Sequence, residues 1–115
     1  MWLFLHLYIF YCPQSKLFIF VFVYQSQTYN IIYHVYILQS EPNGKFYIGS
    51  TGNLAERLKR HNGGRSKATK FGIPWKLVYT ENFESRSEAI KREMEIKSWK
   101  SHLKIEKLII AKQSS

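Results

Sequence analysis

The chain has 115 residues, which is enough for one domain and too few for two. Its formal net charge is +9, because 17 Lys and Arg residues stand against 8 Glu residues and no Asp. This balance is typical of proteins that contact nucleic acids. The single cysteine, Cys12, excludes an intrachain disulfide and predicts a cytoplasmic protein. The sequence contains neither a Cys/His cluster typical of zinc sites nor a glycine-rich phosphate loop.

Residues 1–32 form a hydrophobic extension that differs in composition from the rest. Lys16 is its only charged residue, and it lies in a polar break between two apolar runs, residues 1–11 and 17–24. Neither run reaches the ~20 residues that span a bilayer, although residues 1–24 together are long enough. A signal peptide is not indicated, because a basic start and a small-residue cleavage site are missing. Three interpretations follow, in this order: a start-site artefact ahead of a domain that begins near residue 33, a membrane anchor, or an added strand.

A hairpin follows this extension. Residues 33–38 and 45–48 are rich in aromatic and β-branched residues and predict two antiparallel strands, and the Glu-Pro-Asn-Gly segment at 41–44 predicts the turn between them. Whether the loop has two or four residues, Tyr36 and Tyr47 fall on the same face, because side chains alternate along a strand. The pair therefore either presents two phenols to a site or packs as core with hydroxyls at the rim.

A helix is predicted directly after the hairpin. Asn53 is suited to cap it, and Glu56 three residues later completes the pattern of a capping box. Arg57 and His61 are one turn apart, so their side chains can converge on one anion, and the planar guanidinium suits a phosphate. The alternative is that Arg57 is solvated and His61 is an ordinary residue of a helix C-terminus.

Basic residues recur through the rest of the chain. Residues 62–70 are glycine-broken, basic and free of acidic residues, which predicts a mobile loop that contacts phosphates. The alternative for any one of these residues is a solvated surface position. The residues that we expect to contact nucleic acid are Lys45, Lys59, Arg60, Arg65, Lys67, Lys70, Lys97 and Lys100.

A third strand is predicted at residues 75–81, followed by a helix from a capping pattern at Ser85 to about residue 100 and a last helix at 102–111. Within the first of these helices, Glu93 lies in the apolar stripe marked by Ala89 and Ile96. A carboxylate buried in an apolar face needs a partner or a metal ion. Glu93 is therefore a candidate ligand for one Mg²⁺. The alternatives are a side chain that reaches the edge or an ion pair with Arg57 or Lys97.

Together, these motifs resemble the GIY-YIG nuclease family over about residues 34–110, and most closely its small single-domain branch. The second tripeptide, Tyr47-Ile48-Gly49, is intact, whereas His34-Val35-Tyr36 keeps only the tyrosine of the first. The motifs that sit at the family's spacing are Ser50-Thr51, Asn53-Leu54, Arg57-Leu58, His61-Asn62, Pro74-Trp75, Leu77-Val78-Tyr79 and the run from Ala89 through Arg92-Glu93 to Ile96-Lys97.

The resemblance implies a three-stranded antiparallel sheet with flanking helices and phosphodiester cleavage with one divalent ion, Mg²⁺ or Mn²⁺. By position, Tyr47 matches the proposed base, Tyr36 the supporting phenol, Arg57 the phosphate clamp and Glu93 the metal ligand, while His61 completes the catalytic set. Many family nucleases carry an Asn a little over ten residues after the metal-binding Glu. Residues 104–108 of this chain contain none.

The predicted fold class is α/β of the α+β type, in a GIY-YIG-like domain at residues 33–111 with a tail at 112–115. Two functions stay open. The first is a Mg²⁺-dependent DNA endonuclease directed by DNA structure in repair or recombination, with a protein partner that supplies specificity. The second is a catalytically weak nucleic-acid-binding domain on the same scaffold. A membrane partner is expected only if the extension is a real part of the protein, through residues 1–24.

Overall fold

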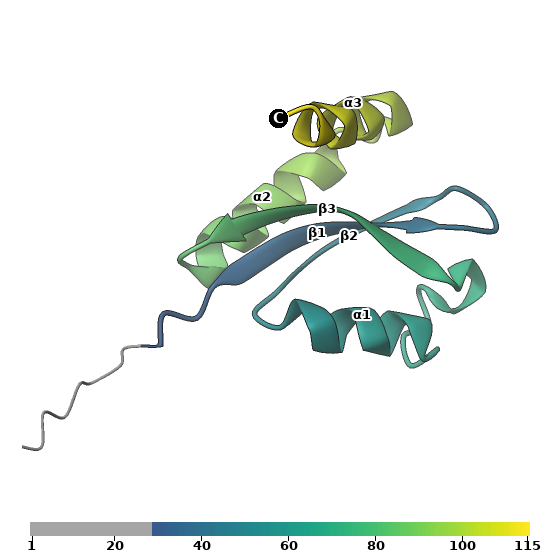
Figure 1. The fold of residues 1–115 in the computed structure, drawn as a ribbon, viewed down its shortest axis with the longest axis horizontal. Coiled ribbons are helices and arrows are strands. Elements are labelled where there is room, and N and C mark those ends of the chain that lie inside the picture. Colours follow the sequence, from purple (N-terminus) through teal and green to yellow (C-terminus); the bar gives the residue numbers. More distant parts are fainter. Residues whose placement is uncertain (1–28) are drawn as a thin grey trace, which may run out of the picture.

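The computed structural model describes residues 29–115, so the predictions for the hydrophobic extension lie almost wholly outside the described residues. One antiparallel sheet of order β2-β1-β3 has α1 on one face and α2 and α3 on the other (Figure 1). This arrangement confirms the predicted fold class. The elements are β1 (Tyr33–Ser40), β2 (Phe46–Thr51), α1 (Leu54–Asn62), the 3₁₀ turn η1 (Lys70–Gly72), β3 (Trp75–Phe83), α2 (Arg86–Ser98) and α3 (His102–Gln113).

The predicted hairpin is formed by β1 and β2 around a four-residue loop. Leu38 pairs with Tyr47, and the loop closes where the Gly44 N–H donates to the Ser40 carbonyl at 2.8 Å. Gly44 has a φ of 69°, which a glycine adopts without the strain that a side chain brings. In this register Tyr36 and Tyr47 share a face of the sheet, as predicted, and their ring centroids are 6.3 Å apart.

The helix starts follow the predicted caps. The Asn53 side chain accepts the Glu56 N–H at 3.1 Å at the start of α1, and Ser85 accepts the Glu88 N–H at 3.2 Å at the start of α2. Each cap satisfies a backbone donor that the helix itself leaves unpaired. The end of α2 was predicted about two residues too late, because the chain turns at Lys100, which has a φ of 46°.

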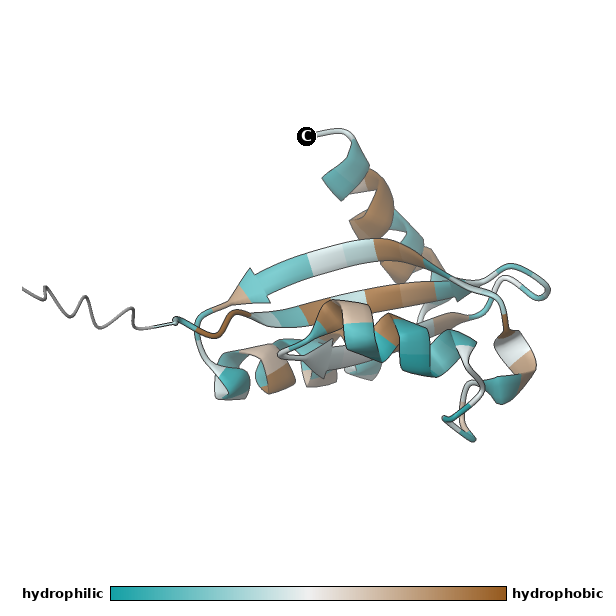
Figure 2. Ribbon diagram, turned by 60° about the horizontal axis from the view of Figure 1, so that its bottom comes forward, coloured by the Kyte–Doolittle hydropathy of each residue, from teal (hydrophilic) through white to brown (hydrophobic). Residues whose placement is uncertain are grey.

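The two faces of the sheet bury different kinds of residue. The face under α2 and α3 is an apolar core made by Val35, Ile37, Ile48, Tyr79, Ala89, Ile96, Ile105 and Ile109. The face under α1 buries Tyr36, Leu38 and Trp75, with Tyr47 and two leucines of α1 packed against them. In Figure 2 hydrophobic segments gather on the strands and on α3, whereas much of α1 is hydrophilic. The α1 face also buries the polar side chains of His61 and Thr69, so it is the more polar of the two.

A bulge in β3 decides which of its side chains face α1. Between Tyr79 and Leu77 the pairing with β1 shifts by one residue, so Val78 is the extra residue. Strict alternation would place Tyr79, Leu77 and Trp75 on one face. Because of the bulge, Tyr79 packs into the core under α2 and α3, while Leu77 and Trp75 pack on the α1 side.

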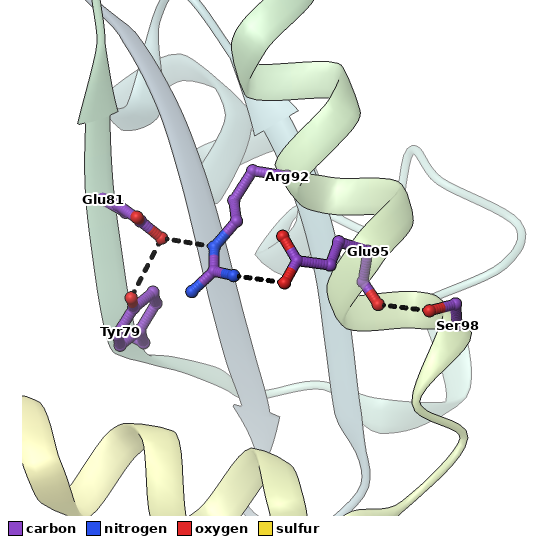
Figure 3. A network of polar contacts seen from close by, with 5 residues as sticks. All are labelled: Tyr79, Glu81, Arg92, Glu95 and Ser98. Atoms are coloured by element: carbon purple, nitrogen blue, oxygen red, sulfur yellow. Dashed lines mark hydrogen bonds and ion pairs between the residues drawn. The ribbon is translucent and has the colours of Figure 1, made fainter.

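A polar network ties α2 to β3 on the side away from α1 (Figure 3). The Arg92 guanidinium donates to Glu81 at 3.0 Å and to Glu95 at 2.9 Å, and the Tyr79 hydroxyl donates to Glu81 at 3.0 Å. Burial, followed by the neighbouring Glu81 carboxylate, raises the pKa of Tyr79. Every polar group of this network has a protein partner, which is typical of a structural role.

Between residues 29 and 115, no helix combines the length and the apolar character that crossing a membrane requires.

Candidate active site

A cavity of about 440 Å³ opens at the outer edge of β2, which is an edge strand of the sheet. Tyr47 and Arg57 reach it from the α1 side, and Ser50 and Glu93 reach it from the α2 side. The strand edge is thus the place where side chains of the two faces meet. Three residues singled out from the sequence, Tyr47, Arg57 and Glu93, line one cavity although they belong to three different elements.

Glu93 is held by two partners. Its Oε2 accepts the Ser50 hydroxyl at 2.5 Å, its Oε1 pairs with the Lys97 ammonium at 2.5 Å, and its side chain is 18% exposed. Of the alternatives raised by the sequence, the ion pair with Lys97 is present, while no ion pair joins Glu93 to Arg57. Lys97 is half exposed, so this pair adds little to the stability of the fold.

The oxygen donors around Glu93 fit a hard divalent ion. Among residues 29–115 no group of three or more His, Cys, Asp or Glu side chains could enclose a metal. Glu93 and Ser50 together offer a carboxylate and a hydroxyl on an open cavity. Mg²⁺ is commonly bound by one or two carboxylates while it keeps waters and contacts substrate phosphates, so this donor set suits it.

Tyr36 lies behind the cavity wall. Its side chain is 1% exposed and crosses over Gly49, where an added Cβ would lie 2.5 Å from the phenol oxygen. The hydroxyl is 3.0 Å from His61 Nε2. Burial, and then the neighbouring Tyr47, raise the pKa of Tyr36 to about 12, while Arg57 acts in the opposite direction. Tyr36 therefore keeps its proton at neutral pH.

His61 is also buried, at 2% exposure, and both of its ring nitrogens have partners. Nε2 faces the Tyr36 hydroxyl, and Nδ1 is 2.9 Å from the hydroxyl oxygen of Thr69. The His61 and Tyr47 ring centroids are 4.7 Å apart. Burial, followed by the charge of Arg57, lowers the pKa of His61, so its imidazole is neutral at pH 7.

Arg57 has an unused hydrogen-bond donor. Its Nε is buried and has no hydrogen-bond partner within the described part of the chain, and no carboxylate there forms an ion pair with its guanidinium. A buried donor without a partner is costly. Arg57 also lines the cavity, where its planar guanidinium matches the geometry of a phosphate.

Three residues of this region received no role from the sequence. Arg86, in the first turn of α2, lines the cavity, and the Ser50 hydroxyl binds Glu93. Thr69, which is 1% exposed, contacts His61. The position of Ser50 directly after Tyr47-Ile48-Gly49 was a usable signal for its role. No local pattern could have placed Thr69, because its contact depends on how the loop after α1 folds back.

The structure divides the predicted nucleic-acid-binding residues into two groups. Exposed positions at the end of α1 and in the connection to β3 form the first group: Lys59, Arg60, Arg65, Lys67 and Lys70. The second group, Lys45, Lys97 and Lys100, lines a hollow of about 340 Å³ between β2 and the α2–α3 corner. The stacked rings of Phe46 and His102, with centroids 4.4 Å apart, belong to the same hollow.

The connection between α1 and β3, which carries Arg65, Lys67 and Lys70, is anchored at its end. Asn62 accepts the Trp75 N–H at 2.7 Å and donates to the Trp75 carbonyl at 3.1 Å. The Trp75 indole in turn donates to the Thr69 carbonyl at 2.8 Å. The sequence predicted that the whole loop is mobile. Because Asn62 and Thr69 are both held by Trp75, this prediction now applies only to residues 63–68.

Several known proteins are similar to this chain. The GIY-YIG catalytic-domain family matches residues 32–108. The UPF0213 protein SSP2268 of Staphylococcus saprophyticus is 38% identical over 74 residues, 64% of this chain and 89% of that protein. The UPF0213 protein SH2523 of Staphylococcus haemolyticus is 42% identical over the same length and coverage. The solution NMR structure of the UPF0213 protein BH0048 from Bacillus halodurans is 36% identical, with a TM-score of 0.47, and the match covers 70% of this chain and 85% of that one.

The chain therefore belongs to the GIY-YIG catalytic-domain family, which is a family of nucleases. This membership confirms the resemblance predicted from the ordered set of motifs between residues 34 and 110.

Proposed function

We propose that this chain is a Mg²⁺-dependent endonuclease, with Mn²⁺ as a substitute, that hydrolyses phosphodiester bonds of DNA. One observation carries the proposal: the Glu93 carboxylate, the Tyr47 phenol and the Arg57 guanidinium, which has no ion-pair partner among the described residues, meet in one cavity at the edge of β2. The guanidiniums of Arg57 and Arg86 in the cavity and the exposed basic residues elsewhere on the surface favour a nucleic-acid strand as the ligand.

In the proposed mechanism each cavity residue has one task. Glu93 would hold the metal ion, with the Ser50 hydroxyl beside it, and the ion supplies positive charge against a phosphate oxygen. Arg57 would donate hydrogen bonds to another phosphate oxygen. Tyr47 would accept a proton from the attacking water. Tyr36 and His61 would act from behind the wall, because neither presents appreciable surface to the cavity.

Arg86 extends the proposed phosphate-binding surface. It lies seven residues before Glu93 on α2, which corresponds to roughly 10 Å along the helix axis at ~1.5 Å per residue. This separation would let Arg86 contact a neighbouring phosphate while Glu93 serves the reacting one.

We further propose a cytoplasmic protein that acts on branched, damaged or single-stranded ends in repair or recombination, with a protein partner for specificity. Membrane attachment would require residues 1–24.

A catalytically weak DNA-binding domain is the second candidate, and a specific observation favours it. Residues 104–108 lie in α3 and contain no Asn, although many family nucleases carry one a little over ten residues after the metal ligand. The ion pair between Lys97 and Glu93 also means that a metal ion would compete with an ammonium group.

Substitution of the carboxylate tests the proposal. With nicked, flapped and junction DNA and with Mg²⁺, we expect Glu93→Gln to lower the cleavage rate by about a hundredfold or more, because the charge that holds the ion is lost. Binding of DNA without metal should change little. Glu106→Gln is the matched control, since Glu106 also pairs with a residue four positions away, His102, and lies outside the cavity. Binding without cleavage by the wild-type chain would support the second candidate instead.

A further inference from the structure

Thr69 stands at the end of a continuous chain of three buried side chains. Its hydroxyl oxygen is 2.9 Å from His61 Nδ1, and His61 Nε2 is 3.0 Å from the Tyr36 hydroxyl. The exposed fractions of Thr69, His61 and Tyr36 are 1%, 2% and 1%. Because water is excluded from such a chain, each of its hydrogens must have a defined direction.

The backbone holds Thr69 in place from both sides. Its N–H donates to the Ser66 carbonyl at 3.2 Å, and its carbonyl accepts the Trp75 indole at 2.8 Å and the Gly72 N–H at 3.1 Å. A Cβ on Gly72 would lie 2.2 Å from the Trp75 ring, so the backbone of this turn packs directly against the indole. Thr69 is therefore a fixed point against which the His61 ring is set.

The direction of the hydrogens follows from the partners at both ends. A neutral imidazole carries one N–H, on either Nδ1 or Nε2. The Ser66 carbonyl, 3.5 Å away, offers an acceptor toward which the Thr69 hydroxyl hydrogen can point, while the hydroxyl oxygen accepts from Nδ1. Nε2 is then an acceptor for the Tyr36 hydroxyl. In the opposite tautomer the Tyr36 hydrogen would turn toward Arg57, whose guanidinium offers only donors.

We propose that Thr69 is a positioning residue that fixes His61 as the Nδ1–H tautomer. In this state Tyr36 donates to His61, and its oxygen stays turned toward the positive charge of the neighbouring Arg57. Thr69 thus orients, through two buried rings, the group that we assign to the phosphate. The role of Thr69 in orienting Arg57 for phosphate binding rests on the proposed function. The assignment of the His61 tautomer does not depend on that function.

Two isosteric or conservative variants of the full chain separate these parts. Thr69→Val removes the hydroxyl and keeps the shape, and Thr69→Ser keeps the hydroxyl. The His61 ring-nitrogen shifts, assigned by comparison with a His61→Asn variant, report the tautomer by NMR. We expect Nδ1–H in the wild-type chain and in Thr69→Ser, and Nε2–H in Thr69→Val.

Cleavage kinetics give the second readout. We expect kcat/KM to fall about tenfold in Thr69→Val and to stay within about twofold in Thr69→Ser, since one neutral hydrogen bond is at stake. Ser40→Ala is the matched control, because Ser40 is 1% exposed and its hydroxyl has no partner among the described residues. It should change neither readout.

Several outcomes would overturn the inference. They are an Nε2–H tautomer in the wild-type chain, an unchanged tautomer in Thr69→Val, or equal losses of activity in the two Thr69 variants. If Thr69→Val does not fold, the His61 tautomer measured in the wild-type chain still tests the inference. Absence of cleavage by the wild-type chain would instead contradict the proposed nuclease, and the tautomer measurement would still stand.

Discussion

The two faces of the small sheet divide the work of this molecule. The face under α2 and α3 buries eight hydrophobic residues, and its polar network of Tyr79, Glu81, Arg92 and Glu95 has a partner for each of its groups. The face under α1 buries a phenol, an imidazole and a hydroxyl and leaves a guanidinium nitrogen without a partner.

This difference separates the apolar core, which stabilises the fold, from the polar side chains that contribute to the candidate site. Burial of apolar side chains stabilises the fold without requiring particular partners. Each buried polar group, in contrast, needs a hydrogen-bond partner to offset its loss of water. Glu93 and Ser50 reach the cavity from the stable face, and Tyr47 and Arg57 reach it from the polar face. At the edge of β2, the proposed metal ligand Glu93 comes from the apolar face, and the proposed phosphate-binding group Arg57 comes from the polar face. Four experiments break or sharpen this comparison, beginning with the largest expected effect.

Removing one tyrosine hydroxyl from each face of the sheet distinguishes an effect on catalysis from an effect on stability. Tyr47 belongs to the α1 face, and Tyr79 belongs to the face under α2 and α3. We expect Tyr47→Phe to lower the cleavage rate by about a hundred- to ten-thousandfold, which is the contribution of a general base. Its stability should hardly change, because the Tyr47 hydroxyl forms no hydrogen bond with another described residue. Tyr79→Phe should cost about 1 kcal/mol through the lost bond to Glu81 and leave the cleavage rate unchanged. A larger loss of activity in Tyr36→Phe than in Tyr47→Phe would reverse the roles of the two phenols.

Truncation in the apolar core tests the stable face. Ile96 is 0% exposed, so Ile96→Ala should lower the free energy of unfolding by about 2–5 kcal/mol in chemical denaturation. Met94→Ala on the same helix is the control, since Met94 is 65% exposed and its loss should change stability by less than about 0.5 kcal/mol. Equal effects of the two substitutions would mean that α2 does not supply the core.

A methyl group at Gly49 tests how closely Tyr36 crosses β2. In Gly49→Ala the new Cβ would lie 2.5 Å from the phenol oxygen, so Tyr36 must move, and we expect a loss of about 1–3 kcal/mol of stability together with reduced cleavage. Gly52→Ala on the same segment meets its nearest atom at 3.5 Å and should be tolerated. Unchanged stability and activity in Gly49→Ala would show that the site does not need this close approach.

Salt dependence of DNA binding tests the basic connection after α1. Replacing Arg65, Lys67 and Lys70 by Ala should flatten the slope of log affinity against log salt by about two to three units, since each phosphate contact on duplex DNA contributes roughly −0.9. The control triple Lys91, Lys107 and Lys112 to Ala removes the same charge from exposed positions on α2 and α3. If the slope did not respond to the first triple, the DNA path would have to run along Lys97, Lys100 and Lys104.

Much of the fold could be predicted because its signals are local. Asn53 and Ser85 cap their helices through partners three residues away, and a hairpin turn fixes the register that brings Tyr36 and Tyr47 to one face. Such signals act between near neighbours in the chain, so the order of residues is sufficient. The candidates Tyr47, Arg57 and Glu93 were found in this way and lie around one cavity.

The tertiary structure alone decided which distant groups meet. The bulge at Val78 sends Trp75 to the α1 side, where its indole fixes Thr69 against His61. The contact of Ser50 with Glu93, 43 residues apart, likewise depends on how α2 packs on β2. A sequence determines local hydrogen bonds and the faces of its helices and strands. Contacts across the sheet are set by packing and by the partners that each buried polar group must find.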